Sequence, residues 1–499
     1  MRSVRLVAFV LTAGFVLAAP APAPDSAAGP NVLLIIADDL NTRIGPYAPP
    51  HIPVHTPNLD SLAARGVTFT RAYAQFPVCG PSRASILSGM YPESIGVTTN
   101  GFENANHKTT PGLVEHPSLP QLFRDEGYYT ARVSKIWHMG VPGGIERGES
   151  GSDDPDAWDF AVNLTAPETL TPGTLETLSR GPHYGSNFAR MVLPDGDEST
   201  QADVLAANQA IAIIQSRTGR IPDGATNRTR LKPDAPFFLA VGLVRPHVPL
   251  IYPERHARMH PDADAPLPHV PAGDLRDVPT QAQRMSNARR YRMSEPEQRK
   301  AVAAYHASVS FMDEQVGRIL RALEQSGQAG NTLIVFVSDH GFNLGEHSAW
   351  QKLSLWEDAT RVPLIVAGPA VGQGRAEGIT ELIDLYATIA AAAGLDASET
   401  VQGRDFSHAL QAPGSHGGGE AYIITNGGAA LRTDRYRYSR WGDAPGAENE
   451  ELYDHFNDPG EFTNLARHPA AQATLDSLRT RFDAKRAAVR AHGARYGVR

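Results

Sequence analysis

Two mostly apolar runs that each end in acidic side chains constrain the fold more than any other feature of this chain. Residues 31–37 (NVLLIIA) lead into Asp38 and Asp39, and residues 331–338 (NTLIVFVS) lead into Asp339. Continuous apolar runs of this length are typical of strands buried on both faces of a parallel sheet. Ligands of open α/β sheets bind at the carboxyl ends of the strands. We therefore expect these acids to meet in a binding site.

Further predicted strands and helices alternate along the chain. Strands are expected at 129–134 and 236–243. The predicted helices span residues 56–66, 118–127, 297–324 and 382–393. This alternation predicts an α/β sandwich around a mostly parallel sheet. Two stretches rich in Pro, Gly and polar residues, at 142–156 and 253–295, are expected to be long surface insertions of the kind that shape a cleft.

The C-terminal part of the chain has a different pattern. A flexible Gly-rich stretch at 412–419 (APGSHGGG) predicts a domain boundary. Three alternating segments, at 421–425, 430–433 and 435–441, predict antiparallel strands, and an amphipathic pattern around 471–492 predicts a closing helix. We therefore expect a main domain over residues 29–412 and a small α+β subdomain over residues 413–499.

The N-terminus has the pattern of a signal peptide. Arg2 and Arg5 precede an apolar run over residues 6–19, which is too short to span a bilayer. Small residues and prolines follow, and cleavage after Ala18 or Ala28 would satisfy the small-residue rule. Residues 1–28 are therefore predicted to be a signal peptide of an exported, periplasmic or extracellular protein without stable membrane insertion. A retained N-terminal anchor is the alternative.

Net charge and cysteine content exclude several classes of function. The chain carries 46 basic and 54 acidic side chains, for a net charge of −8, whereas bulk nucleic-acid binders usually show a basic excess. We therefore expect no nucleic-acid partner. The single cysteine, Cys79, allows no intrachain disulfide, no four-cysteine or Cys₂His₂ zinc site and no iron–sulfur cluster.

Cys79 lies in a segment that predicts the start of a helix. In Cys79-Gly80-Pro81-Ser82-Arg83, Pro81 suits the first turn of a helix running towards Met90. The helix dipole and the guanidinium of Arg83 would favour an anion at Cys79. One interpretation is a nucleophilic thiolate with a lowered pKa. The other is a small buried apolar residue.

The acids that follow the two strands predict a metal site. Three carboxylates brought together would repel one another unless a cation neutralised them. Oxygen-rich ligation suits a hard cation such as Ca²⁺ or Mg²⁺. The alternative is that these acids cap helices or lie in solvated turns.

The segment around Cys79, C-x-P-S-R followed by A-S-I-L-S-G, resembles the signature of the type I sulfatases. In that family the cysteine is oxidised after synthesis to formylglycine, an aldehyde whose hydrate is the nucleophile. Other segments are similar to the family's remaining motifs, and Lys352 falls where the family keeps a lysine. These segments are 31–39, 134–138 (SKIWH), 245–249 (RPHVP), 338–341 (SDHG) and 344–347 (LGEH). His340 beside Asp339, and the Lys135-x-x-His138 spacing, are closest to the iduronate-2-sulfatase branch.

The resemblance implies an alkaline-phosphatase-like sandwich with residues 29–412 as the catalytic domain. It also implies one Ca²⁺ per chain, and a separate formylglycine-generating enzyme that matures the protein. The implied metal ligands are Asp38, Asp39, Asp339, His340 and an oxygen of modified Cys79.

The resemblance also implies the catalytic roles. One hydroxyl of the aldehyde hydrate would attack sulfur with Asp339 as the base. His138 would take the proton of the second hydroxyl and so expel sulfate. The sulfate oxygens would be neutralised by calcium, Arg83, Lys135 and Lys352, and the leaving sugar oxygen would be assisted by His247 and Lys352.

These features predict a sulfatase that removes a sulfate ester from a sulfated glycan, with the 2-O-sulfate of a terminal uronic acid as the expected substrate. The substrate's carboxylate would need further cationic groups, for which Arg255 and Arg289 are candidates. Two alternatives remain open. One is a phosphate or phosphonate ester hydrolase with the same nucleophile, and the other is a non-catalytic protein that binds sulfated glycans.

Overall fold

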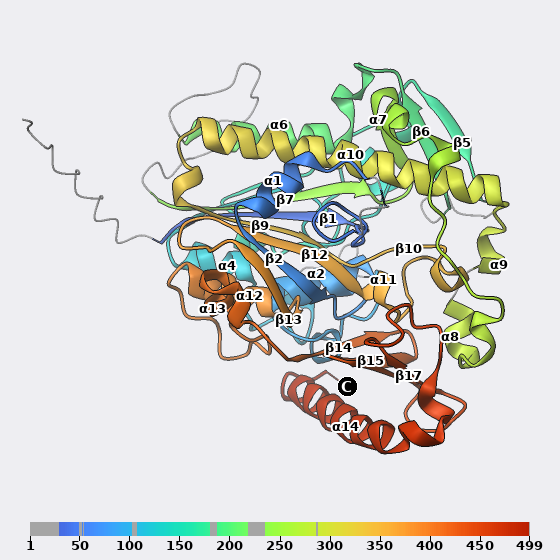
Figure 1. The fold of residues 1–499 in the computed structure, drawn as a ribbon. Helices are drawn as coiled ribbons and strands as arrows, with labels where there is room; N and C mark the ends of the chain where they lie inside the picture. The colour runs from blue at the N-terminus through green and yellow to red at the C-terminus, as the bar shows by residue number, and fades with distance from the viewer. Residues whose placement is uncertain are drawn as a thin grey trace, which may run out of the picture.

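A computed structural model describes residues 29–48, 52, 54–101, 107–179, 187–217, 235–285 and 288–498. The predicted signal peptide at residues 1–28 lies outside the described residues. Figure 1 shows a central sheet between two layers of helices, with a smaller sheet and a long helix at the C-terminal end.

The central sheet has eight strands. β9, β1, β7 and β3 are successive neighbours in it, and each of these pairs is parallel. Only β12 is antiparallel to its neighbours. In spatial order the strands are β13 (Gly374–Glu381), β2 (Val67–Tyr73), β12 (Arg361–Ala367), β9 (Thr332–Ser338), β1 (Asn31–Asp38), β7 (Phe237–Pro246), β3 (Tyr129–Ser134) and β4 (Phe160–Val162). The expectation of a mostly parallel sheet is therefore confirmed.

Both faces of the sheet are covered, which explains the continuous apolar runs. Along β1, Leu33 and Ile35 pack into one hydrophobic cluster, whereas Leu34 and Ile36 pack into the cluster on the opposite face. The first cluster includes side chains of α1 (Pro57–Ala64), α6 (Ala202–Ser216) and α10 (Glu295–Gln325). The second includes side chains of α2 (Cys79–Ser88), α4 (Leu119–Asp125) and α12 (Asp384–Ala392). The predicted helices and strands thus lie close to their observed bounds.

The C-terminal part forms an antiparallel sheet that a helix covers, as expected. The strands are β14 (Glu420–Thr425), β15 (Gly428–Thr433), β16 (Tyr436–Trp441) and β17 (Glu450–Asp454), and the helix is α14 (Gln472–Arg495). The sequence analysis did not predict β17. Tyr422 and Phe482 share a hydrophobic cluster with Phe76 and Tyr91 of the main part. The domain boundary after residue 412 stays a prediction, because this cluster joins the two parts.

Shorter elements connect these layers. The helices are α3 (Pro92–Ile95), α5 (Gly143–Glu146), α7 (Glu254–Met259), α8 (Thr280–Met285), α9 (Ala288–Tyr291), α11 (Glu357–Thr360) and α13 (Ser407–Gln411). The strands are β5 (Thr174–Thr177), β6 (Ala189–Leu193) and β8 (Leu250–Pro253), which form a third sheet, and the pair β10 (Asn343–Leu344) and β11 (Trp350–Gln351). The predicted insertion at 253–295 contains α7, α8 and α9.

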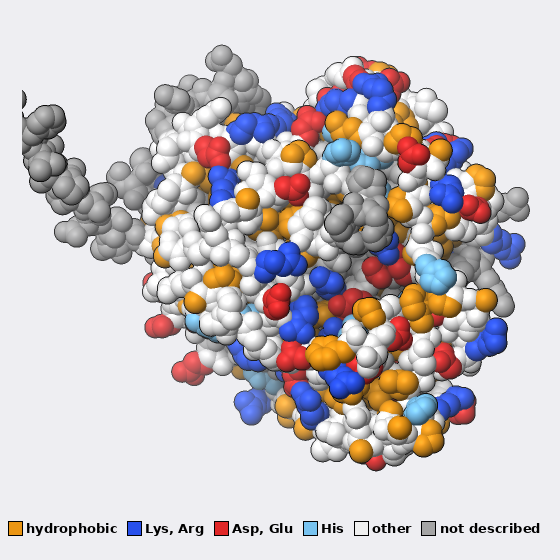
Figure 2. Space-filling view, in the orientation of Figure 1, with side chains coloured by type: hydrophobic (Ala, Val, Ile, Leu, Met, Phe, Trp, Pro, Cys, Tyr) orange, Lys and Arg blue, Asp and Glu red, His pale blue; other side chains and the backbone are white. Residues whose placement is uncertain are grey.

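The surface has mixed charge on the face that Figure 2 shows, where basic and acidic side chains are interspersed. Within the described ranges, no helix combines the length and the apolar character that crossing a membrane requires.

Gly242 of β7 lets the segment after β3 approach the sheet closely. It lies in register with Ser134, and a Cβ atom at this position would overlap the backbone of Lys135. Because that neighbour is backbone, it cannot move aside by a change of rotamer. The absence of a side chain at Gly242 therefore leaves the room that the backbone of Lys135 occupies after β3.

We expect Gly242→Ala to destabilise the protein by about 1–3 kcal/mol, the usual cost of overpacking a filled core. The measurement is the unfolding transition followed by circular dichroism. Gly330→Ala is the matched control, since a Cβ there has no neighbour within 4 Å among the described residues. Equal stability of the two variants would contradict the close approach of the Lys135 backbone.

Candidate active site

The two acid-ended strands bring their polar side chains to one edge of the sheet. β1 and β9 are parallel neighbours, with Ala37 paired to Ser338, so their carboxyl ends coincide. Asp38 closes β1, and Asp39 follows it in the left-handed backbone region with φ of 65°. His340 arrives from β9 two residues after Ser338. The expected meeting of the two strand ends is observed.

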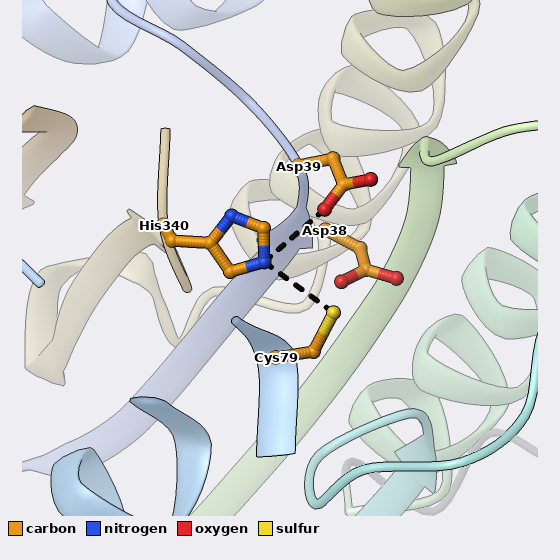
Figure 3. Close-up of side chains that lie close together, drawn as sticks. All are labelled: Asp38, Asp39, Cys79 and His340. Carbon is orange, nitrogen blue, oxygen red and sulfur yellow. Dashed lines mark hydrogen bonds and ion pairs between the residues drawn. The ribbon is translucent and has the colours of Figure 1, made fainter. Parts of the chain in front are cut away.

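Cys79 reaches the same edge from a helix instead of a strand, because it is the first residue of α2. Figure 3 shows the side chains of Cys79, Asp38, Asp39 and His340 directed towards one another. His340 Nε2 lies 3.3 Å from Cys79 Sγ and 3.2 Å from Asp39 Oδ1. His340 Nδ1 lies 2.8 Å from the carbonyl of Gly341. Burial opposes protonation of the His340 ring, but the charges of Asp339 and Cys79 raise its pKa to about 9. Both ring nitrogens therefore carry a proton, so Nδ1 donates to this carbonyl and Nε2–H faces Asp39 and Cys79.

Arg83 joins the two acid-bearing strand ends. Its guanidinium is fully buried and donates from Nε to Asp339 Oδ2 at 2.8 Å and from Nη2 to Asp38 Oδ1 at 3.4 Å. Nη1 donates to the backbone carbonyls of Lys135 and Ile136. The resemblance implied that Arg83 neutralises the sulfate oxygens directly. In the structure its donors are directed at protein groups, so it holds the carboxylates and the Lys135 backbone in place.

Two lysines contact the same acids. Lys135 Nζ lies 2.5 Å from Asp38 Oδ2, and Lys352 Nζ lies 2.8 Å from Asp39 Oδ1 and 3.2 Å from Cys79 Sγ. Lys352 follows β11, and Lys135 follows β3. Both ammonium groups therefore lie beside the side chain of Cys79 or beside the acids that surround it.

The charges of the site are balanced by its own side chains, which changes the electrostatic argument for a metal. The acids are Asp38, Asp39 and Asp339, and the cations beside them are Arg83, Lys135 and Lys352. The sequence analysis expected three carboxylates that needed a bound cation. Repulsion among the acids alone therefore no longer requires a metal ion.

The donor atoms nevertheless fit a divalent metal. One ligand atom each from Asp38, Asp39, Cys79 and His340 lie within 4.8 Å of one another, and all four residues are buried. Asp39 Oδ2 is buried and accepts no hydrogen bond from any described residue. A buried carboxylate oxygen without a donor is costly, and a coordinated cation would satisfy it.

Asp339 lies beside this group rather than in it. Its Oδ1 accepts hydrogen bonds from the backbone N–H groups of Asp39, at 3.2 Å, and of His340, at 2.9 Å. Its Oδ2 faces Arg83. Burial raises the pKa of Asp339 to about 7, against the opposing charges of His340 and Arg83. The resemblance implied that Asp339 is a metal ligand, whereas in this structure its oxygens are engaged by protein donors.

The electrostatic surroundings of Cys79 favour its ionised form. Burial alone would raise the pKa of the thiol, but the charges of Lys352, Lys135 and His340 hold the pKa well below its ordinary value. A hydrogen bond with His138 acts in the same direction. These contacts favour the thiolate of the unmodified side chain over the thiol, which is the direction of the first interpretation of the sequence.

The two remaining predicted histidines flank the cluster. Burial lowers the pKa of His138, the histidine that contacts Cys79. His247 follows β7, and its Nε2 lies 3.7 Å from the unpartnered Asp39 Oδ2. His247 Nδ1 lies 2.6 Å from the carbonyl of Val248. The residues predicted as metal ligands, nucleophile or catalytic groups thus gather at one edge of the sheet.

Several residues that position the site were missed by the sequence analysis. Tyr305 lies within the helix predicted over residues 297–324, and its hydroxyl donates to the carbonyl of Asp39 at 2.7 Å and accepts from Asn41 N–H at 2.9 Å. Asn343 Nδ2 donates to Gln351 O at 2.9 Å and contacts Ser354 Oγ at 3.1 Å, which closes the turn that carries Lys352. No spacing in the sequence marks these contacts.

Other residues named from the sequence lie outside the cluster. His347 pairs with Asp274 at 3.0 Å and stacks on Trp356 with ring centroids 4.3 Å apart. Trp137 packs against Trp158, and Trp350 packs against Phe188. Trp137 of the segment 134–138, and Trp350 and Trp356 on either side of Lys352, are all buried.

A second group of side chains that could bind a metal lies elsewhere, but an arginine side chain occupies the position between its carboxylates. It consists of Glu357, His455 and Glu461. The buried guanidinium of Arg437 donates to both glutamates. Burial opposes ionisation of Glu357, but Arg432, His455 and Arg437 hold its pKa well below the ordinary value. This group is therefore an ion-pair network.

Comparisons with known proteins agree with the geometry. The family described as Sulfatase matches residues 30–158 and 218–395, and the family described as N-sulphoglucosamine sulphohydrolase, C-terminal, matches residues 345–488. A sulfatase of Formosa agariphila is 32% identical over 464 residues, covering 90% of this chain and 85% of that protein. Iduronate 2-sulfatase of Mus musculus is 34% identical over 408 residues, covering 73% of this chain and 69% of that protein.

The fold agrees as well. The solved structure of a phosphonate monoester hydrolase from Silicibacter pomeroyi has a TM-score of 0.71 at 23% identity, covering 92% of this chain and 95% of that chain. This likeness shows the shared fold, and the expected alkaline-phosphatase-like sandwich with a small C-terminal sheet is confirmed. The family match, the identity to named sulfatases and the cysteine-centred site together show that the chain is a sulfuric ester hydrolase that belongs to the sulfatase family.

Proposed function

We propose that this sulfatase removes the 2-O-sulfate from a terminal uronic acid of a sulfated glycan. The observation that carries the proposal is the 34% identity to an iduronate 2-sulfatase over 73% of the chain. Around the nucleophile, Lys135, His138 and His340 lie together as the resemblance to that branch implied. In the proposal, Lys135 and His138 contact the sulfate, His340 holds the metal beside it, and the sugar lies outside these residues.

The nucleophile in this proposal is formylglycine made from Cys79 by a formylglycine-generating enzyme. Its hydrate supplies the attacking hydroxyl and a second hydroxyl through which sulfate can be expelled. Asp339 accepts the proton of the attacking hydroxyl, and His138, which already contacts this side chain, accepts the proton of the second. The site therefore separates the two proton transfers between two residues.

Charge on the sulfate is neutralised by fixed cations. The ammonium groups of Lys135 and Lys352 face the position of the nucleophile and would stabilise the charge that builds up on the sulfate oxygens. Lys352 and His247 would assist the leaving sugar oxygen. Arg83 acts indirectly, since it holds Asp38, Asp339 and the backbone of Lys135 in place.

We propose Ca²⁺ as the metal. Asp38, Asp39 and His340, with an oxygen of modified Cys79, would hold the ion, and Asp339 would complete the ligands after a change in its hydrogen bonds. A bound Ca²⁺ supplies Lewis-acid stabilisation of charge on sulfate. Two carboxylates at the strand ends give the oxygen donors that a hard cation prefers.

The carboxylate of a uronic acid needs a cationic or hydrogen-bonding partner in addition to those that hold sulfate. Arg255 does not supply it, because its guanidinium is engaged by Glu314 at 2.8 Å and by Glu198 at 2.8 Å. The side chain of Arg289 lies outside the described residues. A sulfated saccharide remains the proposed substrate class.

Export is part of the proposal, on the strength of the pattern in residues 1–28. An enzyme for sulfated glycans would meet its substrate in the periplasm or outside the cell. The proposed maturing enzyme would act on the segment around Cys79, which is buried in the folded chain, and therefore before folding is complete.

We expect the active protein to carry formylglycine at position 79. Peptide mass spectrometry should show the mass loss of thiol-to-aldehyde conversion, and Cys79→Ala should lose turnover by more than about 1,000-fold, as loss of a covalent nucleophile does. Cys79→Ala should keep the far-ultraviolet circular dichroism of the parent, because only a small side chain is removed. Full activity of this variant would refute the mechanism. A fully converted but inactive parent would favour the non-catalytic alternative.

We expect calcium to co-purify with the protein. Asp39→Asn should weaken calcium binding by more than about 100-fold, since even partners that only orient a metal ligand contribute about 10–100-fold. Elemental analysis after dialysis against defined free calcium measures the effect. Glu176→Gln is the control, because Glu176 pairs with Arg190 and Lys300 outside the site. Undiminished activity of the parent after exhaustive chelation would contradict the metal site.

We expect a 2-O-sulfated uronate disaccharide to be hydrolysed with a kcat/KM at least about tenfold above that of its competitors, a ratio within reach of pocket contacts. The competitors are a 6-O-sulfated hexosamine, an aryl sulfate and a phosphonate monoester, tested on protein with verified conversion of Cys79. Preference for the hexosamine or the aryl sulfate would reject the uronate assignment alone. Preference for the phosphonate would favour the alternative ester class.

A further inference from the structure

We propose that Glu168 and Arg245 are positioning residues that set the orientation of His247. The inference rests on the proposed function, in which His247 assists departure of the sugar oxygen. Glu168 lies in the 3₁₀ helix η3 (Glu168–Leu170), in a segment for which the sequence analysis predicted no role. Arg245 lies near the end of β7, two residues before His247.

The guanidinium of Arg245 spans the turn that carries His247. Nη1 donates to the carbonyl of His247 at 3.0 Å and to the carbonyl of Pro249 at 2.8 Å. Nη2 donates to Glu168 Oε2. The side chain of Arg245 is only 1% exposed, so these contacts form without competition from bulk water. One side chain thus fixes two peptide groups, one of which belongs to His247 itself.

Glu168 is the counter-ion that makes this arrangement stable. Its side chain is fully buried, and its second oxygen, Oε1, accepts no hydrogen bond from any described residue. Its backbone is held in the left-handed region, with φ of 46°, and Gln201 Nε2 donates to its carbonyl at 3.3 Å. Without Glu168, the buried guanidinium of Arg245 would lose the carboxylate to which it donates and keep only the nearby charge of Asp203. Glu168 therefore determines where the guanidinium of Arg245 lies.

The backbone before the turn is fixed by a second carboxylate. Asp203, in the first turn of α6, accepts the N–H groups of Val244 at 2.7 Å and of Arg245 at 3.0 Å. The turn is thus held on both sides, by Asp203 on its N–H groups and by Arg245 on its carbonyls. The His247 ring projects from this turn, with its Nδ1 2.6 Å from Val248 O and its Nε2 3.7 Å from Asp39 Oδ2.

This arrangement has a consequence for catalysis. If the turn shifts, Nε2 of His247 moves relative to the leaving oxygen, and a misplacement of about 1 Å can cost about 100-fold in rate. The cost depends on the substrate, because assistance by a general acid matters most for a poorly leaving alcohol and least for an activated phenol. A loss of folded protein would instead reduce both rates equally.

The test is Glu168→Gln, which keeps the size of the side chain and removes its charge. We expect kcat for the glycan sulfate ester to fall about tenfold and kcat for an activated aryl sulfate to fall less than about threefold, with KM little changed. His247→Ala should show the same dependence on the leaving group, and the double variant should lose no more than His247→Ala alone.

Glu450→Gln is the matched control. Glu450 is another buried carboxylate paired with an arginine, Arg479, but it lies on β17 in the C-terminal sheet. This control should show no dependence on the leaving group. If Glu168→Gln yields too little folded protein, Arg245→Lys tests the same clamp, because it keeps the charge and removes the fork that spans two carbonyls.

Two outcomes separate this inference from the proposed function. Equal losses of Glu168→Gln on both substrates, with a leaving-group-dependent loss in His247→Ala, would overturn the positioning role alone. A His247→Ala variant whose losses do not depend on the leaving group would overturn the role of His247 in the proposed function and this inference with it. Additive losses in the double variant would also contradict positioning through His247.

Discussion

The buried bridge that Arg83 makes between Asp38 and Asp339 is the interaction on which the rest of the site depends. It joins α2 to the ends of β1 and β9, and so places Cys79 opposite the acids. Burying these charges carries a large desolvation cost, which is offset only when the hydrogen bonds are complete. Arg83 meets that condition because it also donates to backbone carbonyls after β3. The bridge therefore contributes geometry more than net stability.

Charge balance around this bridge gives the site its chemical character. Burial alone would raise the pKa of the Cys79 thiol, but the charges of Lys352, Lys135 and His340 lower it well below its ordinary value. The same fixed cations would meet a sulfate group without reorganisation, which is the condition for strong electrostatic stabilisation. Buried carboxylate oxygens on the opposite side, such as Asp39 Oδ2, suit a metal ion. In the proposed function, the cations of this cluster face the sulfate and its carboxylates hold the metal.

The outer layers of the protein hold this cluster through backbone contacts. Leu353 N–H donates to Pro77 O at 3.2 Å, and Thr425 Oγ1 of β14 donates to Leu353 O at 2.8 Å, so the C-terminal sheet supports the turn that carries Lys352. Arg245 and Glu168 support the turn of His247 in the same manner. Residues that never reach the substrate therefore decide where the reacting groups lie.

The sequence by itself determined the strands that end in acids, the helix that begins at Cys79 and the family, because apolar runs, helix starts and motifs are local patterns. It did not reveal the reversed direction of β12, the hydrogen bonds that Asp339 accepts from protein donors or the engagement of Arg83 and Arg255 by protein groups. Glu168 and Tyr305 carry no local signal, since their partners lie 77 and 266 residues away along the chain. Only the tertiary structure decided these contacts, because hydrogen bonds and ion pairs depend on distances in space that chain spacing does not encode.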